Sequence, residues 1–284
     1  MQNISRIVLF AFWRNLRRNK IVLATTGWFA IVLIMSFFPF LVTPYDPNTT
    51  FAGNTNVPPS PRFLFGSDYV GRDVLSQVIW GSRTSFFIAF GAVIVELLIA
   101  LPFGLLGGYF GGVIDQVLMR IADAMLCMPT IVLLIVAVTL FRAQSEVSII
   151  LVLGLINWPW LAKTIRGQTL RVREEDYLTA ARSLGFGDFY MIRNHVLPNI
   201  TSPIIVISTF DMAWFILYEA TVSFIGLGNP TIPSWGRLLY VGRGLLATAP
   251  WVTIFPGIFI MLTVFSINML GDFLSDMLAL KIGR

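Results

Sequence analysis

Few side chains in this 284-residue sequence could carry out nucleophilic, acid–base or metal chemistry. It contains one cysteine, Cys127, and one histidine, His195. A catalytic serine–histidine pair needs a histidine in a buried site, and a zinc site of the H-E-x-x-H type needs two histidines. His195 lies in a polar segment, where packing is the expected role, and Cys127 lies in an apolar run, where we expect a small buried hydrophobic side chain. The sequence therefore indicates no catalytic site and no metal site.

No nucleotide-binding loop is present either. The pattern G-x-x-x-x-G-K-[ST] does not occur, so the chain cannot hydrolyse ATP by that route. The glycine-rich stretch Leu101–Gly112 lacks a lysine and does not follow a strand. Its glycines are spaced so that another helix can approach closely. We expect no cofactor in this chain.

Three carboxylates fall inside apolar segments: Glu96, Asp211 and Glu219. A carboxylate at the centre of a bilayer costs about 2.5–3.5 kcal/mol on insertion scales, so each should face other helices or a water-filled cavity. Glu219 is the first candidate for facing a water-filled cavity, and a structural hydrogen bond to a neighbouring span is the alternative. Asp211 is the second candidate, and burial against serine or backbone groups would explain Glu96.

The composition is that of a membrane protein with several spans. Hydrophobic residues make up 56% of the chain, charged residues 12%, and the mean hydropathy is +0.77. A soluble domain carries about 25% charged residues. The net charge is +5, but the basic residues flank apolar segments, which positive-inside topology explains better than a nucleic-acid-binding face. We expect an all-α polytopic protein that does not bind nucleic acid.

Six segments are apolar over the roughly 20 residues that a spanning helix needs. They are Ile21–Val42, Phe86–Leu106, Ile121–Phe141, Val147–Ile165, Pro203–Ile225 and Trp251–Asp272. Residues 1–20 form an amphipathic segment before the first span, and their long basic region argues against a cleaved signal peptide. Residues 43–85 form a large loop between the first two spans.

The basic residues predict the orientation. If the N-terminus is inside, the cytosolic segments hold fourteen of the 20 Lys and Arg residues and the outer segments hold six. The positive-inside rule therefore places both termini in the cytosol. It also places the polar stretch 171–199 in the cytosol and the loops 43–85 and 226–250 outside.

The stretch Arg171–Asn199 is predicted to form two short amphipathic helices. Asp176 can cap the first helix, and Gly185 is placed where a helix usually ends in a left-handed turn. Pro198 is expected to end the second. The apolar positions are Tyr177, Ala180, Ala181 and Leu184 in the first helix, and Phe189, Ile192 and Val196 in the second. A compact helix-turn-helix between membrane spans is suited to docking a protein outside the lipid.

This stretch resembles the EAA loop of prokaryotic ABC importer permeases, E-A-A-x3-G-x9-I-x-L-P. Thr179 stands where the family has glutamate, and His195 stands where it has isoleucine. The resemblance implies that the loop inserts into a groove of an ATPase subunit, and His195 is expected to pack at that groove. The coupling residues are then Thr179, Ala180, Ala181, Leu184, Gly185, Asp188, His195, Leu197 and Pro198.

Two further segments resemble permeases of the dipeptide/oligopeptide/nickel class. The first contains Gly66, Asp68, Gly71, Arg72, Asp73 and Arg83. Its charges could instead pair with one another and fix the loop, and Asp68 could cap a short helix with Val74, Val78 and Ile79 on one face. The second runs through Glu219, Ser223, Phe224, Gly226, Gly228 and Trp235. Together with Asp211, this segment is expected to line the translocation path or the outer gate. The loop after Gly226 is expected to be re-entrant or lid-like.

The resemblance covers about Trp13 to Leu280 and implies the fold of a type I ABC importer permease. Residues 86–284 would form the permease core, with the coupling loop 171–199 and the outer loop 226–250. It implies a second, B-type permease chain, two P-loop ATPase subunits that bind ATP and Mg, and an extracytoplasmic solute-binding protein, in a prokaryotic inner membrane. Short peptides are the expected substrates, and oligosaccharides or nickel chelates are the alternatives. The spans alone also allow a passive channel or a secondary transporter, although the docking loop and the lack of a detectable inverted repeat argue against both.

Overall fold

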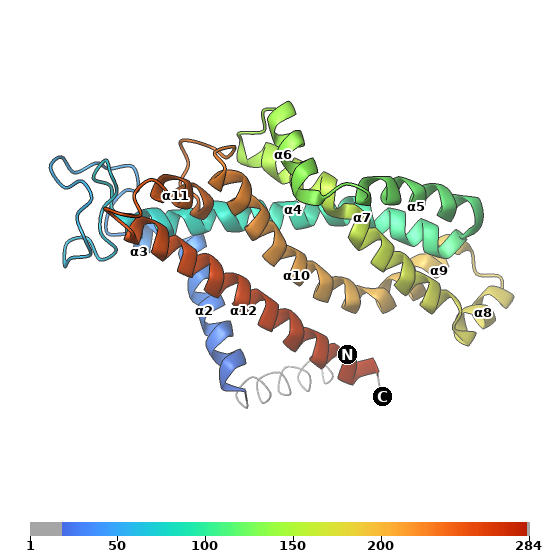
Figure 1. Cartoon of the computed structure of the whole chain (residues 1–284). Coiled ribbons are helices and arrows are strands. Elements are labelled where there is room, and N and C mark those ends of the chain that lie inside the picture. Colours follow the sequence, from blue (N-terminus) through green and yellow to red (C-terminus); the bar gives the residue numbers. More distant parts are fainter. Residues whose placement is uncertain (1–18, 283–284) are drawn as a thin grey trace. The chain divides into compact units, whose positions relative to one another are not determined.

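The computed structural model describes residues 19–282, which divide into two compact units. The first unit joins the chain up to Phe87 to the chain from Glu219 onward, and the second unit is Ile88–Tyr218. Of the expected amphipathic segment 1–20, residues 1–18 lie outside the described part. Every regular element within residues 19–282 is a helix (Figure 1). The predicted all-α class is confirmed.

In the first unit, α2 packs along α12. The unit holds α2 (Lys20–Phe37), α3 (Pro39–Val42), the start of α4 (Val74–Phe110), the end of α10 (Leu197–Phe224), α11 (Trp235–Gly242) and α12 (Trp251–Ile282). Asn19 starts α2, because its side-chain oxygen accepts hydrogen bonds from the backbone N–H groups of the first turn. The Trp28 ring lies edge-on to Phe259, with centroids 5.1 Å apart, and its Nε1 donates to Thr263.

The second unit is built around α7 (Glu146–Arg173). It also holds most of α4 and α10, together with α5 (Gly112–Leu126), α6 (Thr130–Leu140), α8 (Asp176–Ser183), α9 (Asp188–Met191) and the π-helix η1 (Ile192–Val196). Leu161 and Ile165 of α7 are fully buried, and so are Met191, Val196 and Ile200 from the segment that leads into α10. The polar stretch 171–199 is therefore tied to the core of this unit.

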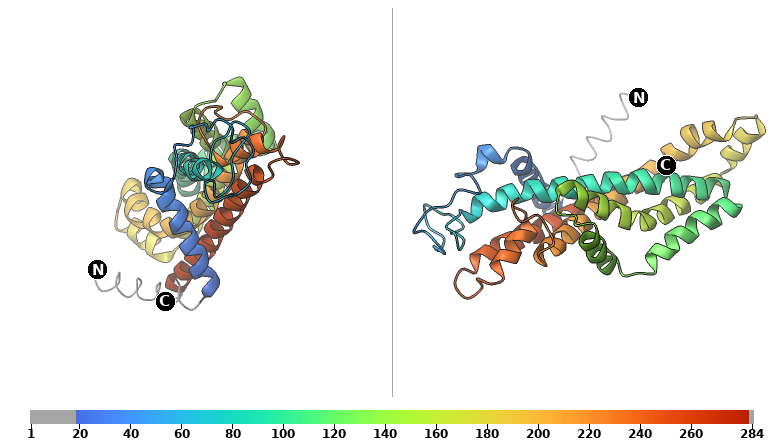
Figure 2. Two further views of the ribbon diagram at one scale, coloured as in Figure 1. Left: turned by 90° about the vertical axis from the view of Figure 1, so that its left-hand side faces the viewer. Right: turned by 90° about the horizontal axis from the view of Figure 1, so that it is seen from above.

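Among residues 19–282, five helices are long and apolar enough to cross a membrane, and the sixth candidate is a broken pair. α5 and α6 together meet the criterion but are bent by 85° at a short break (Figure 2). The predicted third span, Ile121–Phe141, is therefore not one straight helix. Pro129 explains the break, because proline lacks an N–H and disfavours helical geometry in the residue before it. Cys127 lies at the break and is exposed, so the expectation of burial was wrong.

Several predicted helix ends were also wrong. Pro198 does not end a helix, because it is the second residue of α10, directly after the π-helical turn. A π-helical turn shifts the local backbone hydrogen bonds, so a proline, which has no N–H to donate, can follow it. Asp176 lies in the first turn of α8, and Glu175 holds the cap position. Asp73 rather than Asp68 caps α4, since its Oδ2 accepts from the Ser76 N–H at 2.8 Å.

Candidate functional site

The loop between α7 and α10 has the helix-turn-helix form expected from the sequence. α8 is followed by Gly185 with φ +86° and then by α9. A Cβ on Gly185 would meet nothing within 4 Å. The requirement for glycine therefore comes from the left-handed backbone and not from crowding.

The apolar face predicted for the loop points mostly outward. Leu184 is 79% exposed and Phe189 is 76% exposed, whereas Ala181 alone of the predicted positions on α8 is buried. Leu178 and Met191 pack in the core of the unit instead. Helical spacing alone did not predict that these two residues would be the buried ones. The loop thus presents an apolar surface beyond the membrane spans, the kind of surface that protein partners cover.

The residues assigned to ATPase coupling are mostly on this exposed side. Thr179, Ala180, Leu184, Gly185, Asp188 and Pro198 are exposed, and His195 and Leu197 are half-buried. The His195 ring packs against Tyr190, with centroids 5.7 Å apart, and against Tyr177 at 6.1 Å. This aromatic packing lies within the loop itself. The packing of His195 at an ATPase groove and the coupling role of the set stay predictions.

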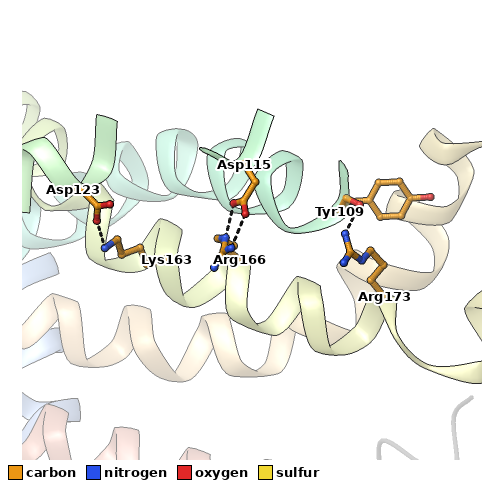
Figure 3. A network of polar contacts seen from close by, with 6 residues as sticks. All are labelled: Tyr109, Asp115, Asp123, Lys163, Arg166 and Arg173. Carbon is orange, nitrogen blue, oxygen red and sulfur yellow. Dashed lines mark hydrogen bonds and ion pairs between the residues drawn. The ribbon is translucent and has the colours of Figure 1, made fainter. Parts of the chain in front are cut away.

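Tyr109, near the end of α4, anchors the loop. Its hydroxyl donates to Oδ1 of Asp188 at 2.8 Å and accepts from Arg182 at 3.4 Å. Arg173 donates to the Tyr109 backbone carbonyl at 3.2 Å (Figure 3). Sequence reasoning missed Tyr109, although a tyrosine among glycines at the end of the second predicted span is a signal that could have found it. Its side chain is 4% exposed, so the contact is part of the packed structure.

Two ion pairs join α5 to α7 on the same side of the unit. Both carboxylate oxygens of Asp115 accept from the Arg166 guanidinium, and Asp123 pairs with Lys163 (Figure 3). The Arg166–Asp115 pair is bidentate, the stronger and more directional form of such contacts. These pairs hold α5 to the helix that leads into the loop.

A cavity of about 340 Å³ lies within the second unit and brings two of the membrane-embedded carboxylates together. Glu96 and Asp211 both line it, with Asn157 and aromatic side chains around them. Glu96 is 1% exposed. Its Oε2 and the Oδ2 of Asp211 are buried and have no hydrogen-bond partner among the described residues. Glu96 therefore faces a cavity, whereas burial against serine or backbone groups was expected.

Glu219 has a different environment, in the first unit. It is 1% exposed, and its two oxygens accept hydrogen bonds from Ser223 at 2.7 Å and from Ser85 at 3.0 Å. Trp235 is fully buried and donates to the backbone of Val78 at 2.9 Å. These contacts favour the structural hydrogen bond that was the alternative for Glu219. A role in the path or gate stays a prediction for this segment.

Two glycines of that segment pack just as closely. Gly226 adopts φ +88°, and a Cβ there would lie 2.9 Å from the Tyr240 ring. A Cβ on Gly228 would overlap Ser223. Phe224, the last residue of α10, is 40% exposed. The predicted lid-like loop contains one short helix, α11, between irregular stretches.

In the segment Gly66–Arg83, the carboxylates of Asp68 and Asp73 accept hydrogen bonds. Oδ1 of Asp68 accepts from the backbone N–H of Arg72 at 2.8 Å, which closes a tight turn at Gly71, where φ is +84°. Within residues 19–282, no ion pair joins Arg72, Asp73 or Arg83, so the predicted pairing was wrong.

Arg237 of α11 lies near this segment. Its burial and the neighbouring Arg72 guanidinium lower its pKa.

Comparison with known families gives two matches that together cover most of the chain. Residues 100–284 match the family described as "Binding-protein-dependent transport system inner membrane component". Residues 10–59 match the family described as the N-terminal TM domain of oligopeptide transport permease C.

Individual relatives match over nearly their whole length. The glutathione transport system permease protein GsiD of Pectobacterium atrosepticum is 35% identical, over 95% of this chain and 90% of its own. The dipeptide transport system permease protein DppC of Alkalihalophilus pseudofirmus is 33% identical, over 94% and 88%. The oligopeptide transport system permease protein OppC of Bacillus subtilis is 32% identical, over 94% and 88%.

Solved structures share the fold at low sequence identity. An inward-facing form of the MetNI methionine ABC transporter matches 72% of this chain and 97% of its own, with a TM-score of 0.59 and 17% identity. An amino acid ABC transporter with histidines matches 70% and 92%, with a TM-score of 0.55 and 17% identity. The fold of the permease chains is thus shared, and the sequence relatives are transport permeases. The chain belongs to the family of binding-protein-dependent transport system inner membrane components.

Proposed function

We propose that this chain is the membrane-spanning permease subunit of an ATP-driven ABC importer for short peptides. One observation carries the substrate class: the near-full-length relatives are named for glutathione, dipeptide and oligopeptide transport. These three substrates are all short chains of amino acids. A peptide substrate is the chemistry that they share.

The exposed apolar loop supports the partner assignment. A permease with no nucleotide-binding loop of its own needs an ATPase, and the loop around Gly185 offers a protein-docking surface. We assign two P-loop ATPase subunits, which bind ATP and Mg, to these loops. A second, B-type permease completes the path, and an extracytoplasmic solute-binding protein delivers the peptide.

The mechanism we propose is alternating access. Closure of the ATPase pair displaces the coupling loop, and the contacts of Tyr109 and Arg166 pass this displacement to α4 and α5. Rigid helices carry such a motion further than flexible segments do. The N- and C-termini lie in the cytosol of a prokaryotic cell, and the loops 43–85 and 226–250 lie outside.

The test is purification of the chain from its native membrane, with identification of every protein that comes with it. Recovery of a second permease and one or two P-loop ATPases is the expected result. The binding protein found with them is then screened against dipeptides, longer peptides, oligosaccharides and nickel chelates. Recovery of the chain alone, conducting in liposomes without ATP, would show that it is a channel.

A further inference from the structure

The cavity in the second unit combines acidic and aromatic side chains. Glu96 of α4 and Asp211 of α10 line it together with Trp160, Trp214 and Tyr218. The rings of Trp214 and Tyr218 stack, with centroids 5.9 Å apart. Trp160 is 65% exposed and Trp214 is 57% exposed, so the cavity is open on the side of these two rings.

One oxygen of each carboxyl group is buried without a hydrogen-bond partner in the described structure. Oε2 of Glu96 and Oδ2 of Asp211 are buried and accept no hydrogen bond there. Glu96 lies at the midpoint of the predicted span Phe86–Leu106, where an isolated carboxylate is costly. A positively charged group that enters the cavity would offset this cost and satisfy both oxygens.

We propose that this cavity is a binding site for the primary ammonium group of the transported peptide. The inference rests on the function proposed above. Glu96 and Asp211 accept the N–H groups of the ammonium, and Trp160 or Trp214 contacts it through the ring face, an interaction that indole provides best among the aromatic side chains. A volume of about 340 Å³ is at the small end of the range for ligand pockets and suits the N-terminal part of a short peptide.

A metal ion fits the cavity less well. No group of three or more histidine, cysteine, aspartate or glutamate side chains with metal-binding geometry occurs in the described chain. Calcium takes six to eight oxygen ligands and magnesium takes six at near-octahedral geometry. Aromatic walls supply none of these ligands, whereas they do stabilise an organic ammonium. The lining therefore favours an amine.

The first experiment measures charge preference in the assembled importer in membrane vesicles. Cys127 is replaced by serine and the cavity residue Asn157 by cysteine, and the thiol is labelled with a 2-aminoethyl or a 2-sulfonatoethyl methanethiosulfonate. We expect the cationic reagent to react about tenfold faster than the anionic one. Equal rates would overturn the proposal without any carboxylate variant.

Variants then assign the preference to the two carboxylates. Glu96→Gln with Asp211→Asn should reduce the rate ratio to about twofold or less. Glu146→Gln is the matched control, because Glu146 is the first residue of α7 and does not line the cavity. It should keep the full ratio. A ratio that survives in the double variant would place the source of the charge elsewhere and overturn the assignment.

Protection and uptake identify the ligand. L-Alanyl-L-alanine should slow the labelling, and N-acetyl-L-alanyl-L-alanine and KCl at equal concentration should not. Equal protection by KCl would show an inorganic cation site, and protection by neither peptide would overturn the proposal.

Uptake of L-alanyl-L-alanine, at saturating loaded binding protein, should fall about tenfold in Glu96→Gln. Unchanged uptake would overturn the site alone. No peptide uptake by the wild-type importer would overturn the proposed function, and the protection experiment would then decide whether an ammonium binds.

Discussion

One residue, Tyr109, links α4 to α7, α8 and α9. Its hydroxyl serves Asp188 and Arg182 at once, and its backbone carbonyl serves Arg173. The Arg182 guanidinium also lies 5.6 Å from the centre of the Tyr109 ring. This cluster attaches the loop to the end of α4.

Replacing Tyr109 with phenylalanine should loosen the loop. The ring and its cation–π contact with Arg182 remain, but the hydrogen bonds that the hydroxyl makes with Asp188 and Arg182 are lost. This loss costs about 0.5–1.5 kcal/mol. Local opening should become about fivefold more frequent. Tryptic cleavage after the exposed Arg193, followed over time in membranes, measures this opening.

The same hydrogen bond can be tested from its other end. Asp188→Asn leaves a weaker acceptor for Tyr109, so the double variant should open little faster than either single variant. Additive effects of the two substitutions would show that the residues act separately. Cleavage at the wild-type rate in Tyr109→Phe would show that the hydroxyl does not hold the loop.

The three membrane carboxylates show the limit of sequence reasoning. The cost of burial predicted that each needs a polar partner or a cavity. It did not predict which, because the facing groups come from distant positions: Ser85 reaches Glu219, and Glu96 shares a cavity with Asp211. A contact between residues more than a hundred positions apart leaves no periodic signal in one sequence.

The close packing of α4 on α7 depends on glycines. A Cβ on Gly104 would lie 2.6 Å from the Ile165 Cβ, and one on Gly108 would lie 2.7 Å from the Thr169 Cβ. The sequence predicted close helix approach from the spacing of these glycines, and the structure confirms it. Gly167, on α7 itself, has open space where a Cβ would be.

Gly108→Ala should therefore destabilise the protein, and Gly167→Ala should not. Forcing a methyl group into a filled contact costs about 1–3 kcal/mol. We expect the midpoint of thermal unfolding in detergent to fall by several degrees for Gly108→Ala. At Gly167, alanine has the better helix propensity and should keep or raise the midpoint. Equal midpoints for the two variants would show that α7 can move away without cost.

The helices themselves were largely predictable, but their ends and breaks were not. Apolar runs of about 20 residues located five straight spans. The break at Met128–Pro129 was missed, because the apolar run continues through it, and Pro198 was taken as an end although a π-helical turn accommodates it. Hydropathy indicates whether a segment lies in lipid or in water, but it does not show where the helical hydrogen bonds of the backbone are interrupted.

The surface of the described chain agrees with a lipid environment. Large apolar side chains on the long helices are exposed, among them Leu98 at 71% and Met261 at 60%. In water such a surface would aggregate, whereas in a bilayer it faces acyl chains of equal polarity.

The orientation gives a prediction for the molecule as a whole. Fourteen of the 20 basic residues lie on one side of the predicted spans, so the loop around Ala180 should be cytosolic and the loop around Asn48 external. Both residues are exposed, and each can be replaced by cysteine in a Cys127→Ser background. A thiol reagent that does not cross membranes should label Asn48→Cys in intact cells, and Ala180→Cys only after the cells are permeabilised. The Cys127→Ser chain without an added cysteine is the control and should stay unlabelled. Labelling of Ala180→Cys in intact cells would invert the topology, and it would place the loop where no ATPase could reach it.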